Sequence, residues 1–223
     1  MSPSSILVII VALILFLLAF ILIKTLIFAR KSSSTSISFK YGVPRFAQDP
    51  QVLAEHLSSV IKIQTISHED PQEDVKENFE TMQALLAKTY PLTHKNLKKE
   101  LVDGHTMIFT WEGKDASLNP VVFMAHQDVV PADEYTIDQW TYPPFSGKIA
   151  DGFIWGRGTM DIKCQMISAF ESVEALLAAK YKPDRTVILT FSHNEEVLGT
   201  GAMAVVQHLK AKGIRVEAVI DEG

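Results

Sequence analysis

The pattern of apolar residues begins with an uninterrupted run of 18, from Ile6 to Ile23, and a shorter apolar stretch follows up to Phe28. As a helix rising about 1.5 Å per residue, this run is long enough to cross about 30 Å of hydrocarbon. Signal peptides usually have a shorter apolar region, a preceding basic residue and a small-residue cleavage site, and the sequence has none of these. We therefore predict a membrane anchor over residues 1–31, which contacts the membrane through residues 6–28. A cleaved signal peptide is the first alternative, and a buried core helix is the second.

The rest of the chain predicts a linker followed by one α/β domain. Residues 32–48 are polar and serine-rich without helical periodicity, which is typical of a linker. Beyond residue 49, segments of helical period alternate with short apolar runs. The predicted helices span residues 51–63, 75–90, 162–180 and 201–212; the predicted strands span residues 107–111, 121–125, 186–191 and 216–220, with a hairpin turn at Asp151-Gly152. This alternation predicts a largely parallel sheet flanked by helices over residues 49–223.

Charge and cysteine content exclude several classes of protein. The first 31 residues hold three of the 21 basic residues and no acid, which leaves 18 bases against 26 acids in the remainder. Because phosphate binding needs a cationic surface, we expect no nucleic-acid partner. The single cysteine, Cys164, excludes an intrachain disulfide and any multi-cysteine metal site. An acidic body instead suits the binding of metal cations through carboxylates.

Three of the predicted strands end in residues that can bind a metal ion. In chain order, the strands run into His126-Gln127-Asp128, Glu195-Glu196 and Asp221, and Asp161 follows a glycine-rich turn at the start of a predicted helix. In open α/β sheets, ligands gather beyond the carboxyl ends of the strands. Imidazole and carboxylates are ligands of zinc and similar ions, and several carboxylates together fit two ions better than one.

Each of these features has a simpler interpretation when it is taken alone. Asp161 can serve only as a helix cap, Glu195-Glu196 can be a solvated pair, and the remaining histidines are typical of surface or core positions. The turn Gly156–Gly158 can be a plain turn or a phosphate-binding loop, which leaves a nucleotide-binding α/β protein as an alternative. The ordered placement of three such clusters at three strand ends favours the metal site.

Five ordered motifs carry a family resemblance. They are Met-Ala-His-Gln-Asp-Val-Val-Pro at residues 124–131, Trp-Thr-Tyr-Pro-Pro-Phe-Ser-Gly at 140–147, Asp-Gly-Phe-Ile-Trp-Gly-Arg-Gly-Thr-Met-Asp-Ile-Lys at 151–163, Glu-Glu-Val-Leu-Gly-Thr-Gly-Ala at 195–202 and Asp-Glu-Gly at 221–223. Over residues 50–223 the chain resembles the zinc aminoacylase and carboxypeptidase family of metallopeptidases, most closely its branch of carboxypeptidase S and the N-fatty-acyl-amino-acid synthase/hydrolases. The resemblance implies a dinuclear zinc amidohydrolase or exopeptidase that cleaves or forms the amide bond of N-acyl amino acids or small peptides.

The resemblance also implies a role for each site residue. The zinc ligands would be His126 and Asp221 for the first ion, Glu196 for the second and Asp161 between both. Glu195 would act as general base on the metal-bridging water and return the proton to the leaving amine. Asp128 would orient His126 by accepting a hydrogen bond from the ring nitrogen that does not bind metal.

The sequence departs from the family pattern in two places. Ile162 stands where many relatives have a second Asp, which we expect to be harmless because that residue is not a ligand. The family's last zinc-binding His, and the lid domain through which a homodimer would form, belong to a segment that would follow Gly223. We therefore expect residues 49–223 to be the N-terminal part of a catalytic domain, inactive by itself. The alternative is a truncated, inactive binding protein on the same scaffold.

The resemblance and the charges near the apolar run predict different locations for the body. Arg30 and Lys31 follow the run, which by the positive-inside rule favours a cytosolic body. The resembling branch implies a vacuolar or extracellular setting. We expect a single-pass protein with a lumenal or extracellular body, in a vacuole-like or lysosome-like compartment or at the cell surface. Secretion after cleavage of the leader is the alternative.

Overall fold

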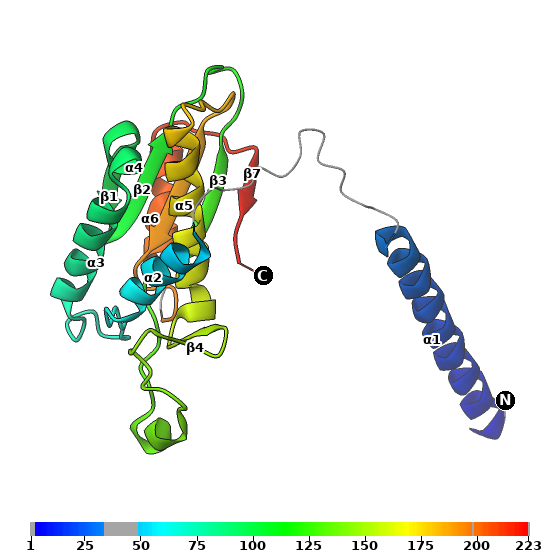
Figure 1. Cartoon of the computed structure of the whole chain (residues 1–223). Coiled ribbons are helices and arrows are strands. Elements are labelled where there is room, and N and C mark those ends of the chain that lie inside the picture. The colour runs from blue at the N-terminus through cyan, green and yellow to red at the C-terminus, as the bar shows by residue number, and fades with distance from the viewer. Residues whose placement is uncertain (1–2, 34–48, 198, 223) are drawn as a thin grey trace. The chain divides into compact units, whose positions relative to one another are not determined.

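The computed structural model describes residues 3–33, 49–197 and 199–222 and divides the chain into two units, Met1–Phe46 and Ala47–Gly223. The described part of the first unit is the helix α1 (Pro3–Ser33) (Figure 1). Its segment Pro3–Ile27 is long and apolar enough to cross a membrane, and its side chains are exposed. A signal sequence would meet the same criteria, so the helix fits either an anchor or a signal. From residue 34 onward, the predicted linker lies outside the described residues.

The second unit is built on a five-stranded sheet in the order β1-β2-β6-β3-β7 (Figure 1). Strands β6 (Val187–Ser192), β3 (Val121–His126) and β7 (Ala218–Ile220) run parallel to one another. Strands β1 (Lys98–Val102) and β2 (Thr106–Trp111) add an antiparallel hairpin on the β6 side. The α/β prediction is confirmed, and the sheet is mixed rather than largely parallel. The reason is the tight turn between β1 and β2, because so short a connection can join only antiparallel neighbours.

Helices cover both faces of this sheet. The helices α2 (Pro50–Ile61), α3 (Lys76–Thr89) and α5 (Cys164–Ala178) contribute to one core cluster, as do Tyr90 and Leu97 at the two ends of α4 (Pro91–Asn96). The helix α6 (Thr200–Ala211) contributes to the other. Alternate residues of a strand point to opposite faces, so Met107 and Phe109 of β2 pack in the first cluster and Ile108 packs in the second. The core thus lies in two layers, one on each side of the sheet.

The predicted helices and strands of the body are present, with ends shifted by a few residues. The predicted hairpin forms the separate pair β4 (Lys148–Ala150) and β5 (Phe153–Trp155). The helix predicted from residue 162 is preceded by a short π-helical segment, η2 (Thr159–Lys163), and α5 begins at Cys164. The sequence prediction missed β1, the short helix α4 and the 3-10 helix η1 (Glu134–Gln139).

Candidate metal centre

His126 lies at the carboxyl end of β3, where its neighbour across the sheet is Ser192 at the end of β6. Its side chain is buried, with 1% exposed. The Nδ1 atom lies 3.0 Å from the backbone oxygen of Asp128 and 3.3 Å from the carboxylate of the same residue. In neutral imidazole one ring nitrogen carries the proton and the other accepts. A proton held at Nδ1 by these acceptors leaves the lone pair of Nε2 directed at the carboxylates described next.

Carboxylates from three segments approach the Nε2 atom of His126. Asp161 Oδ1 lies 3.2 Å from it, Glu222 Oε1 lies 3.7 Å away and Glu195 Oε2 lies 3.8 Å away. Two sets of three residues have ligand atoms within 4.8 Å of one another: His126 with Asp161 and Glu196, and His126 with Glu195 and Glu222. One imidazole surrounded by carboxylates is a donor set typical of catalytic zinc and of other first-row divalent ions.

Asp161 is held outside helix α5, although the sequence allowed a simple capping role. Its backbone angles, φ −115° and ψ 94°, are not helical, and α5 begins three residues later with Lys163 at its cap position. The turn before it needs Gly158, where φ is +81° and a Cβ atom would lie 2.5 Å from a methyl group of Val129. This kink leaves the Asp161 side chain 69% exposed and free to bind at the strand ends.

Asp128 connects the strand that carries His126 to the loop that carries both glutamates. It is fully buried and accepts a hydrogen bond of 2.6 Å from the Ser67 hydroxyl. Its two oxygens also accept hydrogen bonds from the backbone N–H groups of Glu195 and Glu196, each at 3.1 Å. Burial raises the pKa of Asp128, but the hydrogen bonds from His126 and Ser67 outweigh it and leave the pKa lowered. Asp128 is therefore ionised, and it holds the backbone of Glu195 and Glu196 next to His126.

The pKa values of the surrounding groups report crowded negative charge. Burial lowers the pKa of His126, but Asp128, Glu222 and Glu195 outweigh it and raise the value to about 9. Burial, followed by the charge of Asp161, raises the pKa of Glu196. Burial also raises the pKa of Glu222, with a further contribution from Glu195. A divalent cation would relieve this repulsion and displace the imidazole proton, so the donor set fits a metal site.

Five residues were predicted as metal ligands or as the general base. The structure brings four of them together: His126, Asp161, Glu195 and Glu196. The fifth, Asp221, is exposed just beyond β7, and the carboxylate of this segment that approaches His126 belongs to its neighbour Glu222. The sequence analysis missed Glu222. Its only signal was a second acid after the same strand.

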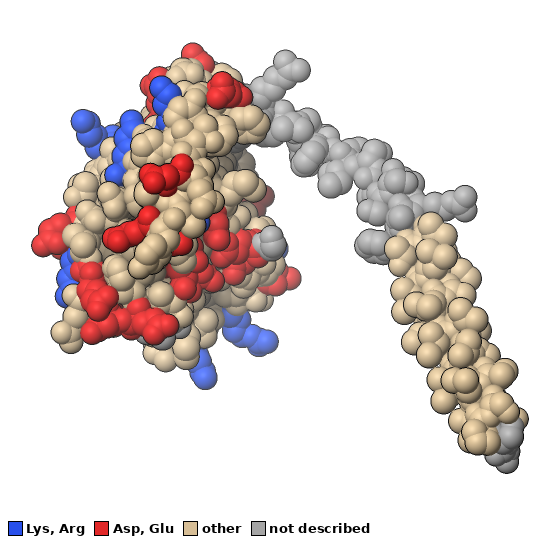
Figure 2. Space-filling view, turned by 90° about the horizontal axis from the view of Figure 1, so that it is seen from below, with Lys and Arg blue, Asp and Glu red and all other residues tan. Residues whose placement is uncertain are grey.

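Acidic side chains gather on the face of the body seen from below in Figure 2, and basic side chains lie mostly towards its rim. The parallel strands β3 and β7 run towards this side of the body, where β7 leads to the C-terminus in Figure 1. The charge distribution on this face agrees with a site for cations.

The fold and this candidate cluster agree with the catalytic domain of an α/β metallopeptidase, and so do the comparisons with known proteins. The sequence profile described as "Peptidase family M20/M25/M40" matches residues 122–223. Carboxypeptidase S of Saccharomyces cerevisiae is 36% identical over 208 residues, which cover 86% of this chain and 36% of that protein. The human N-fatty-acyl-amino acid synthase/hydrolase PM20D1 is 34% identical over 182 residues, 80% of this chain and 36% of the relative. Residues 122–223 thus match the M20 peptidase family, which agrees with the resemblance that the motifs carry.

Solved structures agree on the fold. An M20 family metallo-carboxypeptidase from Sulfolobus solfataricus superposes with a TM-score of 0.59 at 22% identity, covering 79% of this chain and 38% of that one. Human carnosine dipeptidase 1 gives a TM-score of 0.58 at 19% identity, covering 77% and 38%. The chain spans between 34% and 40% of the length of the first three curated relatives.

Proposed function

We propose that residues 49–223 form the N-terminal part of the catalytic domain of a zinc-dependent amidohydrolase or exopeptidase acting on N-acyl amino acids or small peptides. The observation that carries this proposal is the approach of Asp161, Glu195 and Glu222 to Nε2 of the buried His126, with Asp128 behind the ring. The printed names of two relatives, a carboxypeptidase and an N-fatty-acyl-amino acid synthase/hydrolase, support the substrate class.

The proposed ligands are His126 and Asp221 for a first zinc ion and Glu196 for a second, with Asp161 shared by both. Bound zinc would lower the pKa of a water molecule and polarise the scissile carbonyl group. Asp128 fixes the ring orientation of His126 through the Nδ1 side, as carboxylates beside ligating histidines usually do. Removal of such a partner typically costs one to two orders of magnitude in metal affinity or activity, roughly 10–100-fold.

Glu195 is the proposed general base. Its side chain is 48% exposed, and its Oε2 atom lies 3.8 Å from the imidazole, so it faces both solvent and the site. It takes one proton from the attacking water while the water oxygen bonds to the acyl carbon, and it returns that proton to the leaving amine as the C–N bond breaks. The reverse sequence of steps joins an acyl group to an amino acid and releases water.

The hydrogen bonds from the backbone of Glu195 and Glu196 to Asp128 support different roles for the two glutamates, general base for Glu195 and metal ligand for Glu196. Adjacent side chains in a segment that is not helical diverge, so one glutamate can bind metal while its neighbour handles the proton. Because both N–H groups are held by one buried carboxylate, the relative position of the two glutamates is fixed by the backbone.

We further propose that residues 1–31 anchor the protein in a membrane with the body on the lumenal or extracellular side. The apolar helix α1 supports an anchor and equally allows a cleaved signal. A protease-protection assay on sealed microsomes tests the orientation: the body resists digestion until detergent is added. Digestion without detergent would put the body in the cytosol. A lid domain, and a homodimer through it, would belong to polypeptide outside this chain.

The enzymatic proposal is tested on the native polypeptide isolated from its source. We expect bound zinc and hydrolysis of N-acyl amino acids or dipeptides. The Glu195→Gln variant is expected to lose hydrolysis and keep zinc. The matched control Glu134→Gln, an exposed acid on η1, should keep both. Hydrolysis that survives Glu195→Gln would remove the assigned base.

The mass of the native polypeptide separates the enzyme from an inactive binding protein. A mass well above 24.8 kDa would mean that the polypeptide is long enough to include the lid domain and the remaining zinc ligand. A mass near that value, without zinc and without hydrolysis, would favour the binding protein instead.

A further inference from the structure

One buried asparagine joins the two ends of the loop that carries Glu195 and Glu196. Asn194, the residue before the two glutamates, is 5% exposed. Its Oδ1 atom accepts a hydrogen bond of 2.9 Å from the backbone N–H of Gly201. Its backbone oxygen accepts a second, of 2.8 Å, from the N–H of Gly199. Asn194 therefore holds the chain before the glutamates against the chain after them.

The helix α6 depends on Asn194 for a hydrogen bond in its first turn. The N–H groups of a first turn have no partner within the helix, and an Asn side chain at the N-cap position often accepts from one of them. The N-cap of α6 is Gly199, and no side chain at that position accepts such a bond. The acceptor is Asn194 instead, on the other side of the glutamates. Gly201 permits the close approach, because a Cβ atom there would clash with Thr106 Oγ1 and would lie 3.1 Å from Asn194 Oδ1.

The direction of the Asn194 amide is fixed by Thr200 and Asp103. The Nδ2 atom of Asn194 donates a hydrogen bond of 2.6 Å to Thr200 Oγ1, and that hydroxyl donates one of 2.7 Å to Asp103 Oδ2. A carboxylate only accepts, and a hydroxyl has one proton to give. Because Thr200 gives its proton to Asp103, it accepts from Nδ2, which leaves Oδ1 for Gly201. The turn between β1 and β2, where Asp103 lies, is thereby connected to the start of α6.

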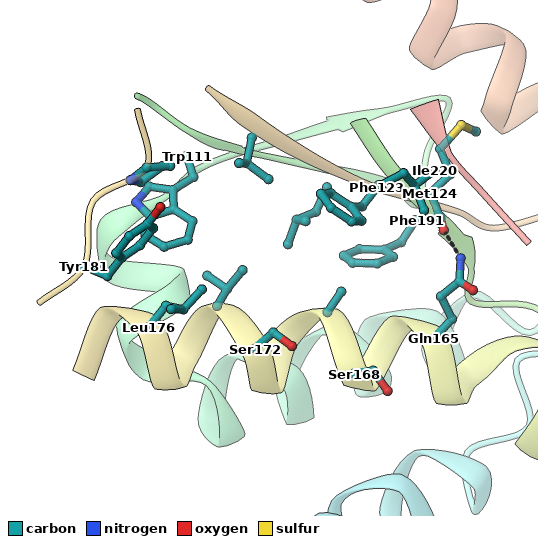
Figure 3. A pocket seen from close by; sticks show the side chains of 15 residues that line it. Trp111, Phe123, Met124, Gln165, Ser168, Ser172, Leu176, Tyr181, Phe191 and Ile220 are labelled. Atoms are coloured by element: carbon teal, nitrogen blue, oxygen red, sulfur yellow. Dashed lines mark hydrogen bonds between the residues drawn. The ribbon is translucent and has the colours of Figure 1, made fainter. Parts of the chain in front are cut away.

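The strand that carries His126 is held by different contacts. The Gln165 side chain of α5 donates a hydrogen bond of 2.6 Å to the backbone oxygen of Met124 in β3 (Figure 3). This bond involves neither α6 nor the loop of the two glutamates. A change at Asn194 should therefore loosen the glutamates and leave β3 in place.

We propose that Asn194 is a positioning residue of the metal centre, which holds the backbone of Glu195 and Glu196 where Asp128 accepts from both N–H groups. Asp128 fixes the two N–H groups themselves, and Asn194 fixes the chain on either side of them. The role rests on the proposed function, in which Glu196 binds zinc and Glu195 handles the proton. It acts through the glutamates, because the side chain of Asn194 spends both of its polar atoms on Gly201 and Thr200.

The test measures amide hydrogen exchange, resolved by residue, on the full chain in lipid nanodiscs with EDTA. The N–H groups of Glu195 and Glu196 exchange when their hydrogen bonds to Asp128 open. In Asn194→Ala we expect both amides to exchange at least about tenfold faster, with the amides of β3 unchanged. Zinc affinity, measured by competition titration, should fall about tenfold or more.

A conservative variant should restore the position of the glutamates. Asn194→Asp keeps an acceptor for the Gly201 N–H, so exchange and zinc affinity should return to within about threefold of the parent chain. Thr200→Val removes the partner of Nδ2 without touching Asn194 and should speed exchange at least about threefold, whereas Thr200→Ser should not. The matched control Asn119→Ala, an exposed asparagine before β3, should behave like the parent chain.

Three results would overturn the role of Asn194. They are unchanged exchange at Glu195 and Glu196 in Asn194→Ala, an equal rise in the amides of β3, and an Asp variant no better than the Ala variant. Circular dichroism establishes that each variant folds; if Asn194→Ala does not, the comparison of Thr200→Val with Thr200→Ser decides in the same way. A parent chain that binds no zinc would contradict the proposed function, and the exchange rates would still decide whether Asn194 positions the glutamates.

Discussion

The ammonium group of Lys163 donates a hydrogen bond of 2.9 Å to the backbone oxygen of Ile63. It donates a second, of 3.1 Å, to the backbone oxygen of Val60 in the last turn of α2. The side chain is fully buried, and burial lowers its pKa to about 7. A helix C-terminus favours a positive group, which offsets part of the cost of burial. Lys163 therefore fastens the kinked segment that carries Asp161 to the end of α2.

Replacing Lys163 should lower both the stability of the fold and the zinc affinity of the metal centre. Lys163→Met removes the ammonium donor from two carbonyl groups, each of which keeps a backbone N–H donor. For the two lost charge-assisted hydrogen bonds we expect a loss of about 1–3 kcal/mol in the free energy of unfolding. Because Asp161 lies two residues away in the same segment, zinc affinity should also fall about tenfold or more. Urea unfolding in EDTA and zinc competition titrations measure the two effects.

Lys62 provides the control for Lys163→Met. Lys62 is exposed directly after α2, and Lys62→Met should change the free energy of unfolding by less than about 0.5 kcal/mol. If both variants behave alike, the hydrogen bonds of Lys163 do not position Asp161.

Asp128→Asn tests whether one buried carboxylate organises the whole site. The variant keeps the shape of the side chain but substitutes an NH₂ group for one of the two oxygens that accept from the backbone of Glu195 and Glu196. We expect zinc affinity to fall roughly 10–100-fold, with the two glutamates less well fixed. The exposed Asp138→Asn serves as the control and should bind zinc like the parent chain. Unchanged affinity in Asp128→Asn would mean that the glutamate loop is held by other contacts.

The sequence predicted the residues of the site that lie where a strand or turn must end. His126 ends β3, the two glutamates follow β6 and Asp161 follows the glycine turn, so parallel strands and a kinked turn bring them to one edge. The sequence could not decide which acid beyond β7 faces His126, because adjacent residues of an extended segment face opposite sides. That choice depends on backbone angles past the last paired residue.

The missed strand β1 has a different cause. Three of its five residues are charged, Lys98, Lys99 and Glu100, so it lacks the apolar alternation by which strands are recognised. Its place comes from pairing with β2, and it forms the edge of the sheet, where charged residues also discourage association with other chains. Because the sequence pattern did not predict β1, it did not predict the antiparallel hairpin of β1 and β2, and the sheet was expected to be largely parallel.

Two single substitutions distinguish the carboxylates after β7. The proposed ligand set requires Asp221→Asn to lower zinc affinity at least tenfold and Glu222→Gln to lower it less than about threefold. Asp221 directly follows Ile220, the last residue of β7, which pairs with Phe123 of β3. Equilibrium dialysis with zinc, at one protein concentration for both variants, measures the difference. The reverse result would assign the ligand to Glu222, whose carboxylate lies 3.7 Å from His126.

His94 gives the fold a dependence on pH away from the metal centre. Its ring stacks on Phe170, with centroids 5.9 Å apart, and meets Phe109 edge-on at 5.1 Å. Burial, with a smaller contribution from the charge of Lys99, lowers its pKa although the Tyr90 carbonyl opposes the shift. The folded chain therefore holds this imidazole neutral at a pH where the unfolded chain already binds a proton.

The sign of the effect follows from proton linkage. Below the unfolded pKa of about 6.5 the unfolded chain binds more protons at this position, so stability from His94 is complete above that pH and is lost as the pH falls. Between pH 7.5 and 5.5 we expect the urea midpoint of the parent chain to fall relative to that of His94→Phe, which keeps the ring stack without a titratable group. The comparison between the two chains is needed because His126, whose pKa is raised to about 9, acts in the opposite direction in both. Lys95→Met, exposed on the same helix α4, should retain the pH dependence of the parent chain. Equal drops in the His94→Phe and parent chains would show that protonation of His94 is not coupled to unfolding.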